Sequence, residues 1–161
     1  MSKLLLVDTR EKPKAIEGIL RTFDAASVPY ERTKLLFGDY MDYNRPDIVI
    51  DRKQTIQELA KNVTVERSRF VSELNRAKLA GARLVILVEQ NRYKDRDKWI
   101  HVEDISDLML WSCKHTSIRG EAVYRRLSGL EYNYNIDVKF CDKRSTGKEI
   151  LKIIYGENLE K

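Results

Sequence analysis

The sequence is poor in the residues that mark fibrous, disordered and disulfide-stabilised proteins. Its 161 residues include only 7 Gly, 3 Pro and 2 Cys, which excludes collagen-like and low-complexity classes and a disulfide framework. Apolar runs such as residues 4–7 and 84–88 are far shorter than the ~20 residues that cross a bilayer, and we see no secretion signal. We therefore expect a soluble, cytoplasmic protein without membrane contact. Cys113 and Cys141 are expected to be buried, reduced thiols.

Charged residues make up 34% of the chain and hydrophobic residues 42%, a balance that predicts a folded protein. The length suits one domain, which we place over residues 1–161. The net charge is +5, and residues 61–98 alone contain ten Lys and Arg against five Asp and Glu. This segment indicates a surface for a polyanion, with an ordinary solvated helix face as the alternative.

Hydrophobic periodicity divides the chain into alternating strands and helices. The expected strands are 4–8, 30–43, 47–53, 83–89 and 137–141, and the expected helices are 13–26, 55–62, 67–80, 103–112, 118–130 and one beginning at 146. Residues 90–101 are expected to form a surface loop. The apolar strands need cover on both faces, so this order predicts an α/β fold in which helices flank a central mixed β-sheet. Thr146 and Glu149 match a capping box, not a nucleotide-binding loop.

Two carboxylates are expected to face each other across a hairpin. If residues 44–46 form a three-residue turn, Asp39 lies opposite Asp51, with Cβ atoms about 4.5–5.5 Å apart. Carboxylates held so close repel unless a cation joins them, and Mg²⁺ or Mn²⁺ suits such oxygen ligands. A two-residue turn would break this pairing. Asp47 is too far along its strand to share an ion with Asp51, because strand residues rise about 3.3 Å each.

Lys53 follows Asp51 by two positions, so both side chains project from the same face of a strand. An ammonium beside a bound metal can orient water or offset charge on a phosphoryl oxygen. The combination predicts hydrolysis of phosphodiester bonds.

Three short motifs resemble, in order and spacing, those of the XPF/Hef-type (ERCC4-domain) nucleases, a branch of the PD-(D/E)xK superfamily. They are Val-Asp-Thr-Arg-Glu at 7–11, Gly-Asp-Tyr at 38–40 and Asp-Arg-Lys at 51–53. The last has Asp where the family has Glu. Residues 69–70 and 84–89 are also similar to that family, whereas we do not expect the tandem helix-hairpin-helix module of many relatives. The resemblance is closest to compact, stand-alone bacterial or phage members.

The resemblance implies a restriction-endonuclease-like fold and metal-dependent cleavage of DNA near a branch, flap or junction. It implies that Asp39 and Asp51 are metal ligands, that the Arg52 carbonyl is a third ligand and that Lys53 is the catalytic lysine. By the same resemblance Asp8 is a further acidic, metal-binding site residue, and Arg10 and Glu11 complete or brace the site. These are the candidate catalytic residues: Asp8, Arg10, Glu11, Asp39, Asp51 and Lys53.

Other charged and aromatic residues allow weaker predictions. Arg69, Lys94, Arg96 and Lys98 are candidate phosphate contacts. Tyr93 and Trp99 either stack on an unpaired base or form half-buried packing. Glu73 and Arg76 are expected to form an ordinary surface pair.

We therefore predict a structure-specific, Mg²⁺- or Mn²⁺-dependent DNA endonuclease that acts on branched DNA as a homodimer and needs no nucleotide cofactor. A Holliday junction resolvase, a sequence-specific restriction-type enzyme and a non-catalytic DNA-binding subunit are the alternatives.

Overall fold

A six-stranded mixed sheet runs through the centre of the computed structural model, which describes residues 2–156. Its strands are β1 (Leu5–Asp8), β2 (Tyr30–Thr33), β3 (Tyr40–Asp42), β4 (Arg45–Lys53), β5 (Arg83–Val88) and β8 (Ile136–Phe140), in the spatial order β2-β1-β3-β4-β5-β8. β3 is antiparallel to both of its neighbours, and the other pairs are parallel. The predicted central mixed sheet is confirmed.

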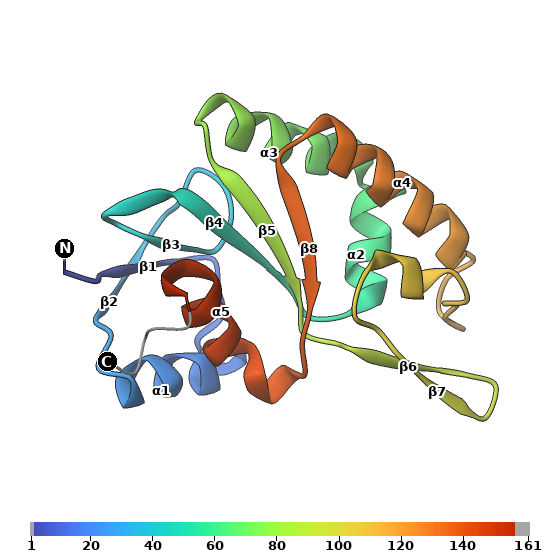
Figure 1. The fold of residues 1–161 in the computed structure, drawn as a ribbon, viewed down its shortest axis with the longest axis horizontal. Helices are drawn as coiled ribbons and strands as arrows, with labels where there is room; N and C mark the ends of the chain where they lie inside the picture. Colours follow the sequence, from blue (N-terminus) through green and yellow to red (C-terminus); the bar gives the residue numbers. More distant parts are fainter. Residues whose placement is uncertain (1, 157–161) are drawn as a thin grey trace.

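Helices cover both faces of this sheet (Figure 1). α1 (Glu17–Ala25) and α5 (Thr146–Tyr155) lie together on one face, and α2 (Ile56–Val63), α3 (Arg67–Leu79) and α4 (Gly120–Asn133) cover the other. Short 3₁₀ turns, η1 (Pro13–Ile16), η2 (Ile105–Leu108) and η3 (Lys143–Ser145), complete the helical elements. No helix between residues 2 and 156 is long and apolar enough to span a membrane.

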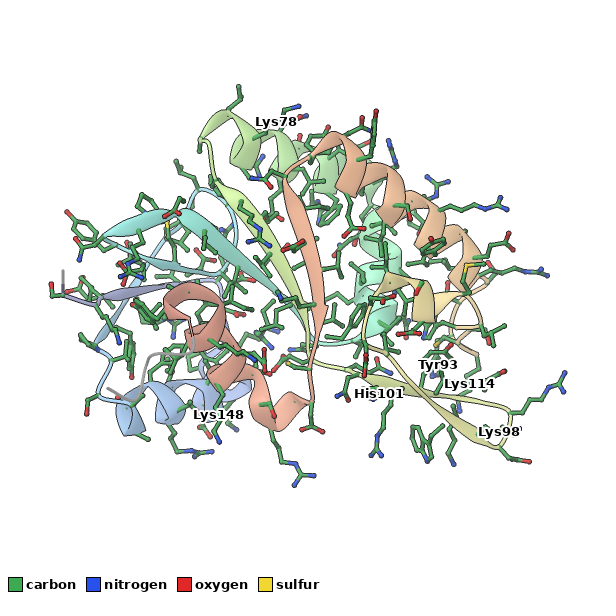
Figure 2. All side chains as sticks on the ribbon, in the orientation of Figure 1. Lys78, Tyr93, Lys98, His101, Lys114 and Lys148 are labelled. Atoms are coloured by element: carbon green, nitrogen blue, oxygen red, sulfur yellow. The ribbon has the colours of Figure 1, made fainter. Side chains whose placement is uncertain are left out.

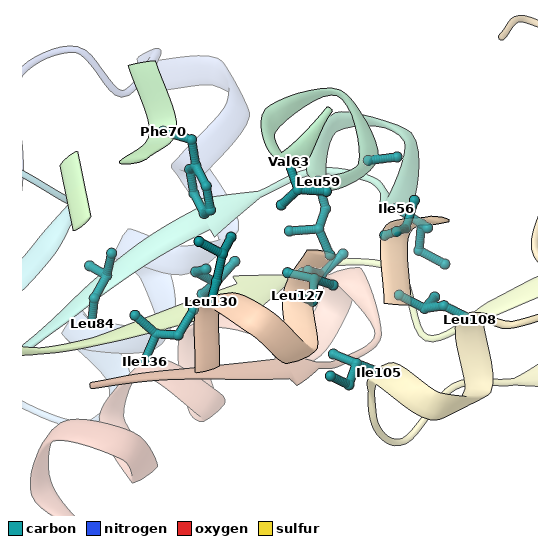
Figure 3. Close-up of a cluster of buried hydrophobic side chains, with 14 of the residues drawn as sticks. Ile56, Leu59, Val63, Phe70, Leu84, Ile105, Leu108, Leu127, Leu130 and Ile136 are labelled. Carbon is teal, nitrogen blue, oxygen red and sulfur yellow. The ribbon is translucent and has the colours of Figure 1, made fainter. Parts of the chain in front are cut away.

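β5 shows why both faces need cover. Leu84, Ile86 and Val88 enter the core beneath α2, α3 and α4, whereas Val85 and Leu87 enter the core beneath α1 and α5. Successive strand residues point to opposite faces, so an almost continuous apolar strand supplies two cores at once. Figure 3 shows the larger core, in which side chains of α2 and α4 meet those of β5 and β8.

The β3–β4 hairpin has the predicted register, but a bulge and not a three-residue turn produces it. Tyr40 pairs with Ile50 and Met41 with Val49, the pairing expected from a three-residue turn. The predicted three-residue turn at 44–46 is wrong. Asp42 pairs with Arg45, so the turn has two residues, and an irregularity beside Met41 leaves residues 46–48 without a partner on β3. The extra residues of this bulge restore the register that a two-residue turn alone would have shifted.

Five further expectations are corrected by the structure. Residues 30–43 form two strands separated by residues 34–39, because β2 and β3 pair with opposite edges of β1. Residues 90–101 contain a hairpin, β6 (Arg92–Asp95) and β7 (Lys98–His101), instead of a loop. The helix expected at 103–112 is reduced to η2. Thr146 does not cap α5, since its hydroxyl donates to Glu89 at 2.6 Å. Cys141 is buried as expected, but Cys113 is only partly buried.

Candidate active site

The candidate residues gather at one end of the sheet. β1, β4 and β5 run in the same direction, so their carboxyl ends share an edge, and the reversed strand β3 begins at that edge. Asp8 ends β1, Asp39 precedes β3, and Asp51 and Lys53 lie at the end of β4. The topology thus brings together three motifs that are spread over residues 7–53 of the sequence.

The backbone holds Asp39 beside the end of β4. Its N–H donates to the Ile50 carbonyl at 2.7 Å, and its Oδ2 accepts the Arg52 N–H at 2.8 Å. Burial, together with the neighbouring charges of Asp51 and Glu11, raises the pKa of Asp39 well above its ordinary value. Asp39 and Asp51 are therefore close together, as expected. Their negative charges repel, which destabilises the ionised form of Asp39.

Glu73 on α3 is a further acid of this cluster. Its Oε2 accepts the N–H of Gly38 at 3.3 Å, and burial together with the charge of Asp51 raises its pKa to about 7. The prediction of an ordinary surface pair with Arg76 is wrong. Helical periodicity could have indicated that Glu73 points toward the protein, because Glu73 lies next to the buried face of α3 formed by residues 70, 74 and 77.

Lys53 lies among these acids. Its Nζ is 3.3 Å from Asp51 Oδ2 and 5.7 Å from the centre of the Phe70 ring. Burial opposes its charge, but the carboxylates of Asp51 and Glu73 outweigh that effect and raise the pKa of Lys53. Lys53 is therefore an ammonium at neutral pH, and it lies on the side of β4 that faces α3.

The intervening residue, Arg52, points to the other face of β4. Its Nε and Nη2 donate to the two carboxylate oxygens of Glu11 at 2.7 and 2.8 Å, and its Nη1 pairs with Glu89. Thr146 at the start of α5 donates to the second oxygen of Glu89. Burial would lower the pKa of Arg52, yet its two carboxylate partners raise it. This buried network fixes the segment whose backbone holds Asp39.

Asp8 already has partners for both of its oxygens. Oδ1 accepts the N–H of Leu35 at 2.8 Å, and Oδ2 pairs with Arg10 Nε at 2.6 Å. Arg10 also donates to the Leu35 carbonyl at 3.0 Å. The hydrogen bond and charge of Asp8 raise the pKa of Arg10, whose side chain remains 60% exposed. Asp8 thus orients Arg10 and the 34–39 loop, and its role as a metal ligand stays a prediction.

The comparisons with known proteins identify the family and the fold of the chain. The ERCC4 domain family matches residues 7–154. The chain belongs to that family. The resemblance to XPF-type nucleases found in the sequence is thereby confirmed. No curated protein matches the chain.

Two solved structures show that this ERCC4 domain shares its fold with XPF from Aeropyrum pernix. XPF from Aeropyrum pernix matches with a TM-score of 0.62 and 19% identity, over 91% of this chain and 57% of that chain. A structure described as the same protein in complex with DNA matches with a TM-score of 0.65 and 20% identity, over 94% and 62%. This ERCC4 domain thus spans about three fifths of the XPF chains that it matches.

The acidic end of the ERCC4 domain has features that suit a hard cation. An open cleft of about 290 Å³ is lined by Arg10, Asp39, Asp51 and Lys53, among others. Asp51 Oδ2 is buried and, apart from its ion pair with Lys53 Nζ at 3.3 Å, accepts no hydrogen bond within residues 2–156. In the same part of the chain, no three His, Cys, Asp or Glu side chains converge as a ready metal cage. Asp39 and Asp51 supply two carboxylates to this cleft, a small ligand set that suits Mg²⁺ because this ion keeps several waters.

The predicted phosphate contacts lie outside the acidic cluster. Arg69 is on α3, where its side chain is 86% exposed and 3.9 Å from Glu66. Lys94, Arg96 and Lys98 belong to the β6–β7 hairpin, which extends beyond the body of the ERCC4 domain (Figure 1). Asp47 is exposed and does not join the cleft, in line with its expected exclusion.

Proposed function

We propose that this ERCC4 domain is a divalent-metal-dependent endonuclease that hydrolyses phosphodiester bonds of branched DNA. The observation that carries the proposal is the crowding of Asp39, Asp51 and Glu73 near the Lys53 ammonium, where Asp39, Asp51 and Lys53 line an open cleft. Adjacent carboxylates without a cation are costly in a folded protein, so their retention at one end of the sheet supports a role for a bound ion.

Asp39, Asp51 and the backbone carbonyl of Arg52 would hold Mg²⁺ or Mn²⁺. When bound, the ion would polarise the scissile phosphate and neutralise developing negative charge. Lys53 would donate from Nζ to a phosphoryl oxygen, and its raised pKa keeps the donor charged. Arg10, held by Asp8 and largely exposed, would contact a neighbouring phosphate.

Binding of DNA is supported by the fold shared with an XPF protein whose structure is described as a DNA complex. The positive charge of residues 61–98 is a second support, because Lys and Arg that neutralise phosphates release counterions. Affinity for DNA should therefore fall steeply as salt is raised. We also propose that the protein acts as a homodimer.

One panel of substrates tests the proposal: 3′ flap, fork, four-way junction and linear duplex, each incubated with Mg²⁺ or Mn²⁺ and resolved by strand. We expect cleavage of one strand near the branch of the flap or fork. Symmetric cuts in the four-way junction would favour a resolvase. Preference for plain duplex would contradict the choice of branched DNA, and binding without cleavage would indicate a non-catalytic DNA-binding subunit.

A further inference from the structure

The β6–β7 hairpin has one anchored face and one exposed face. Tyr93 pairs across the hairpin with Ile100, and both pack against the larger core. Tyr93 is 5% exposed, and its hydroxyl donates to the Asp107 carbonyl at 3.0 Å. The anchored face holds the hairpin against η2, so its outward direction is set by the core of the domain.

The opposite face presents an aromatic ring beside two cations. Because strand residues alternate and Lys94 pairs with Trp99, the side chains of Arg92, Lys94, Trp99 and His101 share this face. The Arg92 guanidinium lies 4.5 Å and the Lys94 ammonium 5.1 Å from the centre of the Trp99 ring. The Trp99 residue nevertheless remains 56% exposed. An indole this open to water leaves a large apolar surface uncovered.

The cationic side chains of the hairpin form no ion pairs with carboxylates of the described residues. Within residues 2–156, none of Arg92, Lys94, Arg96 and Lys98 has an Asp or Glu oxygen within 4.0 Å. In Figure 2, Lys98 lies near the far end of the hairpin and His101 nearer its base. Unpaired cations beside an exposed ring favour a polyanion that also carries flat, apolar groups.

The base of the hairpin is bonded to the strand that carries the site. β5 ends at Val88, and the next residue, Glu89, donates its N–H to the Lys53 carbonyl at 2.8 Å. Gln90 Oε1 then accepts the N–H of Ile56 at 2.9 Å. The hairpin therefore leaves the sheet at the same end as Asp51 and Lys53. A strand of DNA held in the cleft would have the hairpin beside it.

We propose that Trp99 stacks on an unpaired base of branched DNA while the hairpin cations bind the adjacent phosphates. This inference rests on the proposed function, because it assumes DNA as the ligand. Stacking on an aromatic ring requires a base released from its duplex. The hairpin would thus make the protein favour forks and flaps over continuous duplex.

Fluorescence anisotropy in EDTA, where cleavage is prevented, tests the proposal with the full chain. The ligands are a fork with two single-stranded arms and a blunt duplex of the same sequence. Trp99→Ala should weaken fork binding about 5- to 150-fold and leave duplex binding within about twofold. Trp99→Phe should retain most of the fork affinity, since phenylalanine also stacks. Tyr132→Ala, on the exposed surface of α4 and 91% exposed, is the matched control and should bind both ligands like the wild type.

A second readout follows the ring directly. The chain has two tryptophans, and Trp111 is only 4% exposed. Fork DNA should quench the emission of the wild type but not of Trp99→Phe, in which Trp111 alone remains. Unchanged fork affinity in Trp99→Ala, equal losses on fork and duplex, or no fork binding by the wild type would each overturn the proposal.

Cleavage, assayed separately with Mg²⁺ or Mn²⁺, distinguishes this proposal from the proposed function. A wild type that binds forks through Trp99 but cuts no DNA would contradict the nuclease and support the hairpin. Equal fork affinity and equal cutting by wild type and Trp99→Ala would support the nuclease and overturn the hairpin.

Discussion

Arg52 and Glu11 form a buried, two-point ion pair, in which Arg52 Nε and Nη2 donate to the two Glu11 oxygens at 2.7 and 2.8 Å. Arg52 lies between Asp51 and Lys53, so β4 directs the structural pair to one face and the candidate catalytic pair to the other. The network on one face thereby holds the backbone from which the cleft is built.

Arg52→Ala should strongly destabilise the fold. The variant leaves Glu11 and Glu89 buried without a cation, a change that typically costs about 3–5 kcal/mol. Urea unfolding followed by circular dichroism measures the difference. Arg125→Ala is the control, because its pair with Glu121 is exposed and should contribute less than ~1 kcal/mol. Similar losses in the two variants would argue against the structural role of Arg52.

Asp51→Asn and Lys53→Ala should abolish cleavage and leave the fold intact. The first removes a ligand charge, and the second removes the ammonium that offsets phosphoryl charge, so single-turnover rates should fall at least about 100-fold. Asp47→Asn is the matched control, since Asp47 is an exposed acid of the same strand. Full activity in purified Asp51→Asn would contradict the proposed metal site.

Divalent ions should raise the melting temperature of the wild type. An ion at 100 times its Kd adds about 2.7 kcal/mol of stability, which for a domain of this size corresponds to a rise of roughly 5–10 °C. Differential scanning fluorimetry with Mg²⁺ or Mn²⁺ against EDTA measures the shift. Asp51→Asn should lose most of it, and a shift that survives in Asp51→Asn would place the ion elsewhere.

Without metal, stability should fall as the pH rises from about 4.5 to 7, in part because of Glu73. Its folded-state pKa of about 7 exceeds the ordinary 4.5, so the folded protein binds the proton more tightly than the unfolded chain in this window. Glu73→Gln should be more stable than the wild type at pH 8 in EDTA, with a smaller advantage at pH 4.5. Urea unfolding across pH tests this, with Glu121→Gln on exposed α4 expected to follow the wild type.

Gly38→Ala should destabilise the loop that presents Asp39. Gly38 has φ +72°, and a Cβ there would collide with Val49 Cγ1 and lie 3.1 Å from the Ile50 carbonyl oxygen. We expect a loss of at least about 1 kcal/mol and weaker cleavage. Gly129→Ala, within α4 where a Cβ would meet nothing within 4 Å, should instead stabilise by about 0.5–1 kcal/mol. Equal effects of the two substitutions would disprove the conformational argument.

Local patterns in the sequence predicted β1, β4, β5, β8 and the helices α1 to α5, but they placed Asp39 near Asp51 through a three-residue turn that the structure replaces with a two-residue turn and a bulge. They failed where distant segments decide the outcome. Thr146 has the spacing of a capping residue, yet its hydroxyl binds Glu89, 57 residues away in sequence. Residues 92–101 form a hairpin because Tyr93 packs into the core beside η2. Local sequence periodicity cannot predict this contact between distant segments.

The sequence by itself determined the alternation of elements, the three acidic motifs and the side of β4 on which Asp51 and Lys53 project, since these depend on residue type and a two-residue period. Only the tertiary structure decided that Asp8 is engaged by Arg10 and Leu35, that Glu73 joins the acids and that Arg52 is bound by Glu11 and Glu89. Charge and hydrogen bonding act through space, and their partners come from strands and helices that only folding brings together.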